Sequence, residues 1–266
     1  MIVFFSSPTP KLAVSLDNAV ATIAVDNPAK RNAFDLEMWK ALPPIMRALD
    51  DDERVRVVVL RGAGDNAFTA GADISEFGTL RADAEGGRLY EAANEAAFWA
   101  VAQCAKPVIA MIRGFCLGGG LGLALSCDLR IAAEDAVFGI PAARLGVGYP
   151  ANAMRIVTAA AGAPAAKDLF FTARHIDAAE ATRLGLVQRV VSVAALEDAA
   201  LSLAGEIARN APLTIRAAKA AIDHSMGVNR PGADPVALAD LCFESDDAVE
   251  GRRAFMEKRP PVFKGS

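Results

Sequence analysis

The sequence predicts an α/β protein in which strands and helices alternate along the chain. Short apolar runs rich in Val and Ile end in glycine-containing turns, and stretches with apolar residues at helical spacing follow those turns. The composition is 53% hydrophobic but only 6% aromatic, a mixture common in α/β and helical enzymes. A chain of 266 residues can bury one sizeable core and carry a small appendage.

The first elements predicted are a β-hairpin and a helix. Residues 12–16 and 20–25 are β-type runs joined by a turn-prone Asp-Asn-Ala. Asp35 is placed to cap the helix that follows. We expect Pro43 and Pro44 to bend or interrupt this helix, because proline lacks the backbone N–H that a helix interior uses.

A buried strand and a second helix come next. Residues 55–60 form a Val-rich run, as expected of a strand buried on both faces. Residues 68–77 contain Gly71, and Asp73 is placed to cap a short helix within them. The charged residues 81–87 predict a mobile loop before a helix over residues 89–103.

The most informative stretch runs from residue 106 to residue 130. An apolar strand over residues 108–112 leads into Gly118, Gly119 and Gly120, and an apolar helical run follows. The first N–H groups of a helix have no intrahelical acceptor, and glycine lets a ligand approach them. This segment alone is equally compatible with an anion site and with a turn that merely packs a helix closely on its strand.

The rest of the chain divides into a mixed part and a helical part. Further strands are expected over residues 129–132, 136–138 and 186–191, and helices over 154–161, 165–171 and 178–184. From residue 194 only helical, alanine-rich segments follow, over 194–208, 213–226, 234–244 and 247–259. We therefore expect a core of residues 1–193 and a helical oligomerisation region of residues 194–266.

Composition argues against several classes of protein. Basic residues are scattered and the net charge is −4, so no positive surface for nucleic acid is visible. Four separated cysteines and two histidines give no pattern for a metal site or a disulfide framework. No apolar run approaches the roughly 20 residues that span a bilayer, and no basic leader precedes the apolar N-terminus, so we expect no membrane association and a cytoplasmic protein.

A nicotinamide-dependent oxidoreductase is one alternative. Gly62, Gly64 and Ala67 follow a predicted strand in a pattern similar to the dinucleotide fingerprint. That fingerprint should open a helix at once, whereas Phe-Thr-Ala-Gly follows here. The motifs of a serine nucleophile elbow and of a phosphate-binding P-loop are both missing from the sequence.

The two glycine segments are more informative together. Gly71-Ala72-Asp73 and Gly118-Gly119-Gly120 each follow a predicted buried strand and precede a helix. If neighbouring strands carry them, two backbone N–H groups can point at one spot. Such a pair stabilises the negative charge that develops on a thioester oxygen when the α-carbon loses a proton.

An ordered set of motifs closely resembles the crotonase family, the enoyl-CoA hydratase/isomerase superfamily. These motifs are residues 68–74 (Phe-Thr-Ala-Gly-Ala-Asp-Ile), 118–120 (Gly-Gly-Gly), 127–132 (Cys-Asp-Leu-Arg-Ile-Ala), 138–141 (Phe-Gly-Ile-Pro) and 257–263 (Glu-Lys-Arg-Pro-Pro-Val-Phe). The resemblance covers nearly the whole chain after about residue 12. It implies a spiral of ββα repeats with a C-terminal helical region that builds a homotrimer, often a hexamer made of two trimers.

The resemblance also implies site residues. The oxyanion hole would be the N–H groups of Ala72 and Gly119, and the substrate an acyl-CoA thioester, with coenzyme A bound only as part of the substrate and no metal. The groove for coenzyme A would be lined by the turn at residues 31–33 and the segment at residues 70–75, and a phosphate would meet a lysine near the C-terminus. By residue these are Arg31, Ala33, Ala70, Asp73, Ile74, Ser75 and Lys264.

Two departures from the family pattern bear on the chemistry. The hydratases carry one catalytic glutamate at the position of Gly122 and a second at the position of Ala142, and neither residue here can move a proton. Tyr149 is one substitute, close to where the naphthoate synthase branch has an aspartate. Further polar residues near the expected pocket are Glu76, Arg144 and Asn152, while Asp128 is expected to buttress the inner strand.

The leading hypothesis is an acyl-CoA-processing enzyme that stabilises a thioester enolate, with hydration, isomerisation, decarboxylation, hydrolysis and C–C bond chemistry left open. The alternative from another class is a non-catalytic acyl-CoA-binding or assembly protein, because both hydratase glutamates are replaced.

Overall fold

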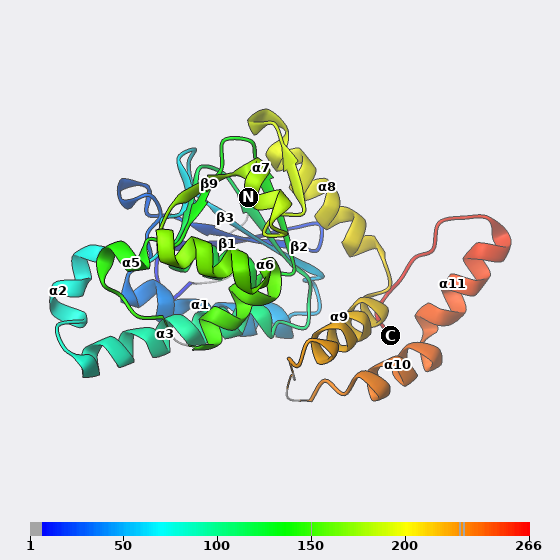
Figure 1. The fold of residues 1–266 in the computed structure, drawn as a ribbon. Coiled ribbons are helices and arrows are strands. Elements are labelled where there is room, and N and C mark those ends of the chain that lie inside the picture. The colour runs from blue at the N-terminus through cyan, green and yellow to red at the C-terminus, as the bar shows by residue number, and fades with distance from the viewer. Residues whose placement is uncertain (1–6, 150, 229, 231) are drawn as a thin grey trace.

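Two β-sheets lie at the centre of the computed structural model, which describes residues 7–266 except 150, 229 and 231 (Figure 1). The strand order is β1-β2-β3-β5-β7-β10 in the larger sheet and β4-β6-β8-β9 in the smaller. The larger sheet contains β1 (Leu12–Asp17), β2 (Val20–Val25), β3 (Val57–Gly62), β5 (Val108–Ile112), β7 (Leu129–Ala133) and β10 (Arg189–Val191). The smaller contains β4 (Ala67–Thr69), β6 (Phe115–Leu117), β8 (Val137–Gly139) and β9 (His175–Asp177).

From β3 to β8, consecutive strands alternate between the two sheets. The neighbours β3, β5 and β7 pair in parallel in the larger sheet, and the strand after each of them, β4, β6 or β8, pairs in parallel in the smaller. Only β1 with β2 and β8 with β9 pair antiparallel among these strands. Because helical residues follow each strand pair, the middle of the chain is a spiral of ββα units, which confirms the predicted fold class.

Helices surround the sheets. The longer ones in the first two thirds of the chain are α1 (Leu36–Asp51), α3 (Ala84–Ala102), α4 (Gly119–Ser126) and α6 (Ala151–Thr172), the last broken at Gly162. The short ones are α2 (Phe77–Leu80), α5 (Ala142–Leu145) and α7 (Ala178–Arg183), with single 3-10 turns at Pro28–Lys30, Ile74–Glu76 and Val193–Ala195. The C-terminal helices are α8 (Leu196–Arg209), α9 (Pro212–Ser225), α10 (Pro235–Glu244) and α11 (Asp246–Glu257). No helix in the described part of the chain is long and apolar enough to cross a membrane.

The Trp39 side chain is fully buried in the main core. Its indole ring stacks on Phe34 at 4.3 Å between centroids and meets the edge of Phe98 at 5.7 Å. The indole N–H donates to the hydroxyl of Tyr90 at 3.2 Å, so the one polar atom of the indole is satisfied. Residues from β4, α1, α3 and α4 thereby pack into a single apolar cluster.

The strands of the larger sheet divide their side chains between two clusters. Along β3, Val58 and Leu60 face the main core, whereas Val57 and Val59 face the opposite side, as the two-residue period of a strand requires. That opposite side is covered by α8 through fully buried alanines. Helix α8 thus packs on the larger sheet, although it falls within residues 194–266, the predicted oligomerisation region.

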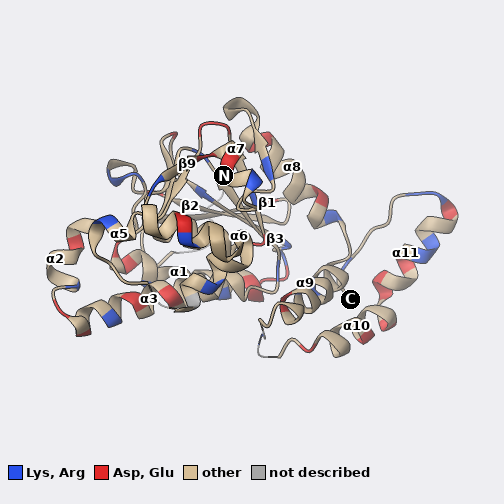
Figure 2. Ribbon diagram, viewed as in Figure 1, with Lys and Arg blue, Asp and Glu red and all other residues tan. Residues whose placement is uncertain are grey.

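The last helices form an arm that extends from the rest of the molecule (Figure 1). We use "arm" for α9, α10 and α11 together with the tail after them. The tail returns to the core, where Arg56 donates to the Phe263 carbonyl at 2.6 Å. Charges of both signs are interspersed on the helices in this view, with no continuous positive region (Figure 2).

Several boundaries differ from those predicted. Helix α3 begins five residues earlier than expected, because the Asp83 carboxylate accepts from the Gly86 N–H at 2.8 Å and caps it. The segment that we expected to be a mobile loop is thus largely helical. Strands β6 and β9 and helix α5 were not predicted, since three or four residues are too few to show a period. The apolar residues 1–5 lie outside the described residues.

Helix α1 also continues through Pro43 and Pro44, contrary to the expected interruption. The two prolines remove backbone donors, but Leu42 and Ile45 on either side of them are fully buried. Apolar burial on both sides therefore keeps the helix intact across a locally unfavourable pair.

One buried ion pair connects the arm to the core. Lys219 on α9 is 92% buried at its side chain and donates to Asp128 at 2.6 Å and to the Lys106 carbonyl at 3.0 Å. The same Asp128 oxygen accepts from the Val108 N–H at 2.7 Å, so Asp128 buttresses the inner strand as expected.

Replacing Lys219 by Met should lower the free energy of unfolding by about 2 kcal/mol, since Asp128 then keeps a half-buried charge without its cation. Urea unfolding at fixed protein concentration measures this change. As the control, Arg183→Met removes an exposed pair to Glu180 and should cost less than about 1 kcal/mol. Equal costs for the two variants would contradict the anchoring role.

Candidate active site

The two glycine turns predicted from the sequence lie against each other. Strands β4 and β6, which precede them, are parallel neighbours, with Thr69 opposite Cys116. A Cβ atom at Gly71 would lie 2.6 Å from the Leu117 carbonyl oxygen, and one at Gly120 would lie 2.4 Å from the Thr69 carbonyl oxygen. Any side chain at either position would push the turns apart, so glycine is needed at both for this approach.

Two backbone N–H groups are left free by this arrangement. The Phe34 N–H donates to the Gly71 carbonyl, and the Asp73 N–H donates to the Phe34 carbonyl, both at 2.7 Å. The Ala72 N–H between them therefore faces away from Phe34. Gly119 is the first residue of α4, where the N–H has no acceptor within the helix. In the described part of the chain, neither N–H has a hydrogen-bond partner.

Ala72 and Gly119 line the same pocket, so the structure brings together the two residues predicted for the oxyanion hole. The pocket holds about 70 Å³ of space. Its other walls include residues of α3, Phe77 and Arg81 at α2, Pro141 and Ala142 at the start of α5, and Tyr149 before α6.

The positions of the two family glutamates are occupied by apolar groups. A Cβ atom at Gly122 would lie 2.7 Å from the ring of Phe98, so this ring already fills the space where a side chain from α4 would begin. Ala142 is buried and lines the pocket, and its methyl group offers no proton. Neither α4 nor α5 therefore supplies an acid or a base at these positions.

Tyr149 lies at the pocket as predicted. Its ring packs edge-on against Phe170 at 5.2 Å, and its hydroxyl lies 3.5 Å from the place where a Cβ at Gly118 would be. Burial raises the pKa of Tyr149 to about 12, so the phenol stays protonated at physiological pH. It can donate a hydrogen bond into the pocket, but it cannot serve as a base there.

The sequence analysis missed three polar pocket residues, namely Arg81, Glu91 and Asn94. Arg81 pairs with Glu91, and its guanidinium lies 4.4 Å from the centre of the Phe77 ring and 5.1 Å from that of Tyr90. Burial raises the pKa of Glu91, and the neighbouring Arg81 cation opposes that rise. For Glu91 and Asn94, the signal in the sequence was the presence of two polar residues on the apolar stripe of the helix predicted over residues 89–103.

The expected coenzyme A residues from the turn at residues 31–33 and the segment at residues 70–75 lie side by side. The Ala70 N–H donates to the Arg31 carbonyl at 3.0 Å, and the Arg31 guanidinium lies 4.8 Å from the centre of the Phe115 ring. Ala70 and Ile74 line the pocket, whereas Ala33 is buried outside it.

Asp73 and Ser75 belong to a small polar cluster beside these residues. Asp73 accepts from Lys30 at 2.5 Å and from the Ser75 N–H at 3.0 Å. Burial raises the pKa of Asp73, but the hydrogen bonds from Lys30 and Ser75 outweigh it, and the net shift is downward. The Asp73 carboxylate is thus already engaged within the chain, while Ser75 is exposed.

The other predicted residues do not reach the pocket within this chain. Lys264 lies beside α11, where its backbone N–H donates to Asp247 at 2.7 Å. Glu76 accepts from the Leu36 N–H at 2.9 Å, and Arg144 is exposed on α5. The side chain of Asn152 lies outside the described part of the structure.

The structural context of a dinucleotide fingerprint is absent here. After Gly62 at the end of β3, the chain runs through Gly64 into strand β4 rather than into a helix N-terminus. The nicotinamide interpretation is therefore wrong in its structural premise. Among residues 7–266 apart from the three gaps, no group of three or more His, Cys, Asp and Glu residues is arranged to hold a metal ion.

The contact between Gly122 and Phe98 can be tested by stability alone. Gly122→Ala should cost about 1–3 kcal/mol of unfolding free energy, and Phe98→Leu in the same chain should recover part of it, because the smaller side chain makes room for the methyl group. Gly87→Ala is the matched control: it lies in α3 with no atom within 4 Å of the new methyl, and should stabilise by about 0.5–1 kcal/mol. Additive costs of the two pocket changes would contradict the contact.

Comparisons with known proteins agree with this geometry. Residues 15–266 match the family model described as enoyl-CoA hydratase/isomerase. The chain is 35% identical over 246 residues to the short-chain-enoyl-CoA hydratase of Clostridium acetobutylicum, covering 91% of this chain and 93% of that protein. The solved structure of an enoyl-CoA hydratase/carnitine racemase from Magnetospirillum magneticum matches with a TM-score of 0.91 at 36% identity over 98% of this chain and 97% of that one. The enoyl-CoA hydratase of Bacillus anthracis matches with a TM-score of 0.88 at 34% identity, covering 96% of this chain and 100% of that one. The chain therefore belongs to the enoyl-CoA hydratase/isomerase family, the crotonase superfamily.

Proposed function

We propose that this protein is an enzyme that acts on an acyl-CoA thioester and stabilises its enolate. The observation that carries the proposal is the pair of unpartnered N–H groups, of Ala72 and Gly119, that line one pocket. When the α-carbon loses a proton, negative charge moves to the thioester oxygen, where the two N–H groups can hold it. The names of the relatives, several of which are enoyl-CoA hydratases, support the same class of substrate.

The reaction we propose is proton transfer at the α-carbon without paired-carboxylate hydration. Hydration by two carboxylates needs one group to activate water and another to deliver a proton. Gly122 and Ala142 supply neither, and the Phe98 ring keeps the first position apolar. The pocket therefore favours isomerisation or another reaction that passes through an enolate over simple hydration.

We further propose that coenzyme A enters as part of the substrate and runs along the turn at residues 31–33 and the segment at residues 70–75. The adjacency of Arg31 and Ala70 supports this path. Lys264 lies away from the pocket of its own chain. The lysine that meets the phosphate of coenzyme A would therefore have to come from a neighbouring copy in an oligomer.

A non-catalytic acyl-CoA-binding protein is the second candidate, and the loss of both family glutamates favours it. A panel of saturated, enoyl, branched and dicarboxylic CoA thioesters separates the two. We expect turnover of at least one panel member. Chromatography of the products measures this turnover. Tight binding of a CoA thioester in calorimetry, with no turnover of any panel member, would contradict the enzyme proposal and support an acyl-CoA-binding protein.

The oxyanion hole is tested by Gly119→Pro, which removes one N–H. Proline is acceptable at the first position of a helix, where α9 and α10 already carry Pro212 and Pro235. Loss of one such donor should lower kcat by about 100-fold to 1000-fold. Gly119→Ala is the matched control, since it keeps the N–H and adds a Cβ that lies 3.4 Å from Asn94 and from Trp39. Equal rates for the two variants would exclude a role for the N–H.

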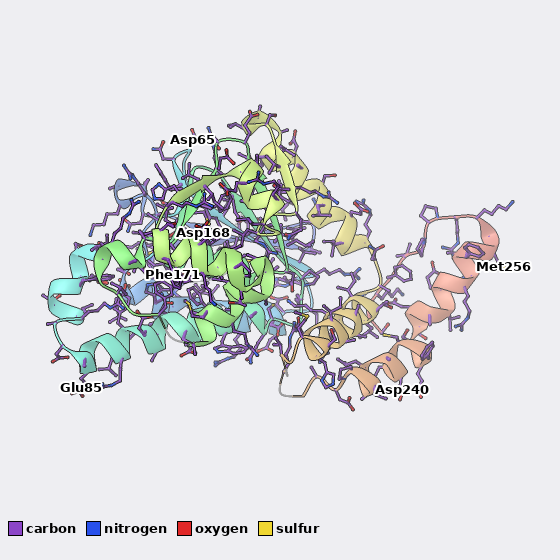
Figure 3. All side chains as sticks on the ribbon, in the orientation of Figure 1. Asp65, Glu85, Asp168, Phe171, Asp240 and Met256 are labelled. Atoms are coloured by element: carbon purple, nitrogen blue, oxygen red, sulfur yellow. The ribbon has the colours of Figure 1, made fainter. Side chains whose placement is uncertain are left out.

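We also propose that the chain assembles as a homotrimer, alone or as a hexamer made of two trimers. The arm carries large apolar side chains that are mostly exposed in a single chain, among them Phe243 at 79%, Phe255 at 83% and Met256 at 80%. Figure 3 shows Met256 at the outer end of the arm. Exposed apolar area of this kind marks an interaction surface, and a second copy of the chain fits the proposed symmetry.

The assembly is tested by Phe243→Ser combined with Phe255→Ser. Mass photometry should give three or six times the 27.8 kDa chain for the unmodified protein and a smaller species for the double variant. The control is Phe171→Ser, which changes an equally exposed phenylalanine on α6, away from the arm (Figure 3). A monomeric unmodified protein would contradict the proposal.

A further inference from the structure

Helix α3 presents one face to the pocket, and this face carries the polar groups that α4 and α5 lack. Glu91, Asn94 and Phe98 are spaced i, i+3 and i+7, so they lie in one row along the helix. Phe98 fills the space beside Gly122, and the Asn94 amide nitrogen lies 3.4 Å from the place where a Cβ at Gly119 would be. The row therefore runs past the proposed oxyanion hole, with Glu91 one turn before Asn94.

Glu91 is the only acidic residue among the described residues that line this pocket. Its side chain is 27% exposed, and Arg81, itself 12% exposed, contacts one of its carboxylate oxygens. Arg81 is held in turn over the rings of Phe77 and Tyr90. The carboxylate is thus fixed at one oxygen by a nearly buried cation, and its second oxygen has no hydrogen-bond partner within the described chain.

We propose that Glu91 is the catalytic acid/base group of this enzyme, supplied by α3 in place of the two glutamates of the family pattern. The inference rests on the proposed enolate chemistry. An enolate forms only if a base takes the α-proton, and the phenol of Tyr149 is protonated at physiological pH. Of the described side chains that line the pocket, Glu91 is the one that carries a carboxylate to accept this proton.

The proton transfer balances within the pocket. A Glu91 carboxylate oxygen takes the proton from the α-carbon, and the electron pair of that C–H bond forms the C=C bond of the enolate. The former carbonyl oxygen gains the negative charge and accepts from the Ala72 and Gly119 N–H groups. The partly exposed Glu91 carboxyl then exchanges its proton with water before it protonates the α-carbon, which replaces the α-hydrogen by one from solvent. Alternatively it delivers the proton to the γ-carbon of an unsaturated chain, which moves the double bond.

Arg81 is a positioning residue in this scheme. Its cation favours the carboxylate form of Glu91 against the burial that disfavours it. The other titratable groups near Glu91 are Arg88, Tyr90 and Glu95 on the same helix and Tyr149 before α6. Removing the Arg81 cation should therefore raise the pKa of Glu91 and leave less of the basic form at a given pH.

The test is exchange of the α-protons of butyryl-CoA in D2O, followed by NMR, because this saturated probe cannot be hydrated. The wild-type protein should exchange them, and Glu91→Gln should be slower by at least about 100-fold while still binding butyryl-CoA in calorimetry. Glu91→Asp, with a shortened carboxylate, should retain part of the rate. Glu85→Gln, an exposed acid in the first turn of α3 and outside this pocket, is the matched control and should exchange like the wild type.

A pH profile separates a base from a structural residue. The exchange rate should fall as the pH drops through the pKa of Glu91, and in Arg81→Met this fall should move to higher pH. Exchange by Glu91→Gln at the wild-type rate, or an unmoved profile in Arg81→Met, would overturn the assignment while leaving the enolate proposal intact. No exchange by a wild-type protein that binds the probe would overturn both.

Discussion

The close approach of two chain segments, made possible by missing side chains, is the constraint on which the site depends. Gly71 and Gly120 each stand where a single methyl group would collide with a backbone oxygen of the other segment. The parallel register of β4 and β6 places the two glycine turns side by side, and the glycines allow the short distance between the turns. The meeting of Ala72 and Gly119 in one pocket therefore comes from backbone geometry, and the proposed oxyanion hole needs no special side chain at either position.

Much of the fold and part of the site could be predicted from the sequence. The hairpin, the buried strands and most long helices have clear apolar periods, and the Asp35 and Asp73 caps lie where the spacing placed them. The short strands β6 and β9 lacked enough residues to show a period. The continuous course of α1 through two prolines depends on tertiary burial, which no local pattern reveals.

The polar wall of the pocket was missed for a different reason. The family motifs place the catalytic groups at the positions of Gly122 and Ala142, and neither residue carries an acid or a base. Glu91 and Asn94 lie on another helix and come to the pocket only through the packing of α3 against α1 and α4. Their proximity depends on side-chain contacts such as the Phe98 ring against Gly122, which a single sequence does not display.

The ion pair between Lys219 and Asp128 bears on how the protein unfolds. Asp128 lies two residues after the end of α4, accepts a hydrogen bond from the first N–H of β5 and accepts another from the Lys219 ammonium group of the arm. Helix α8 covers one face of the larger sheet a few residues before the arm begins. These contacts therefore connect the helical end of the chain to the segment after α4, the helix that begins with Gly119. Local opening at α8 or α9 and loss of the pocket should therefore appear together as one step in amide hydrogen exchange.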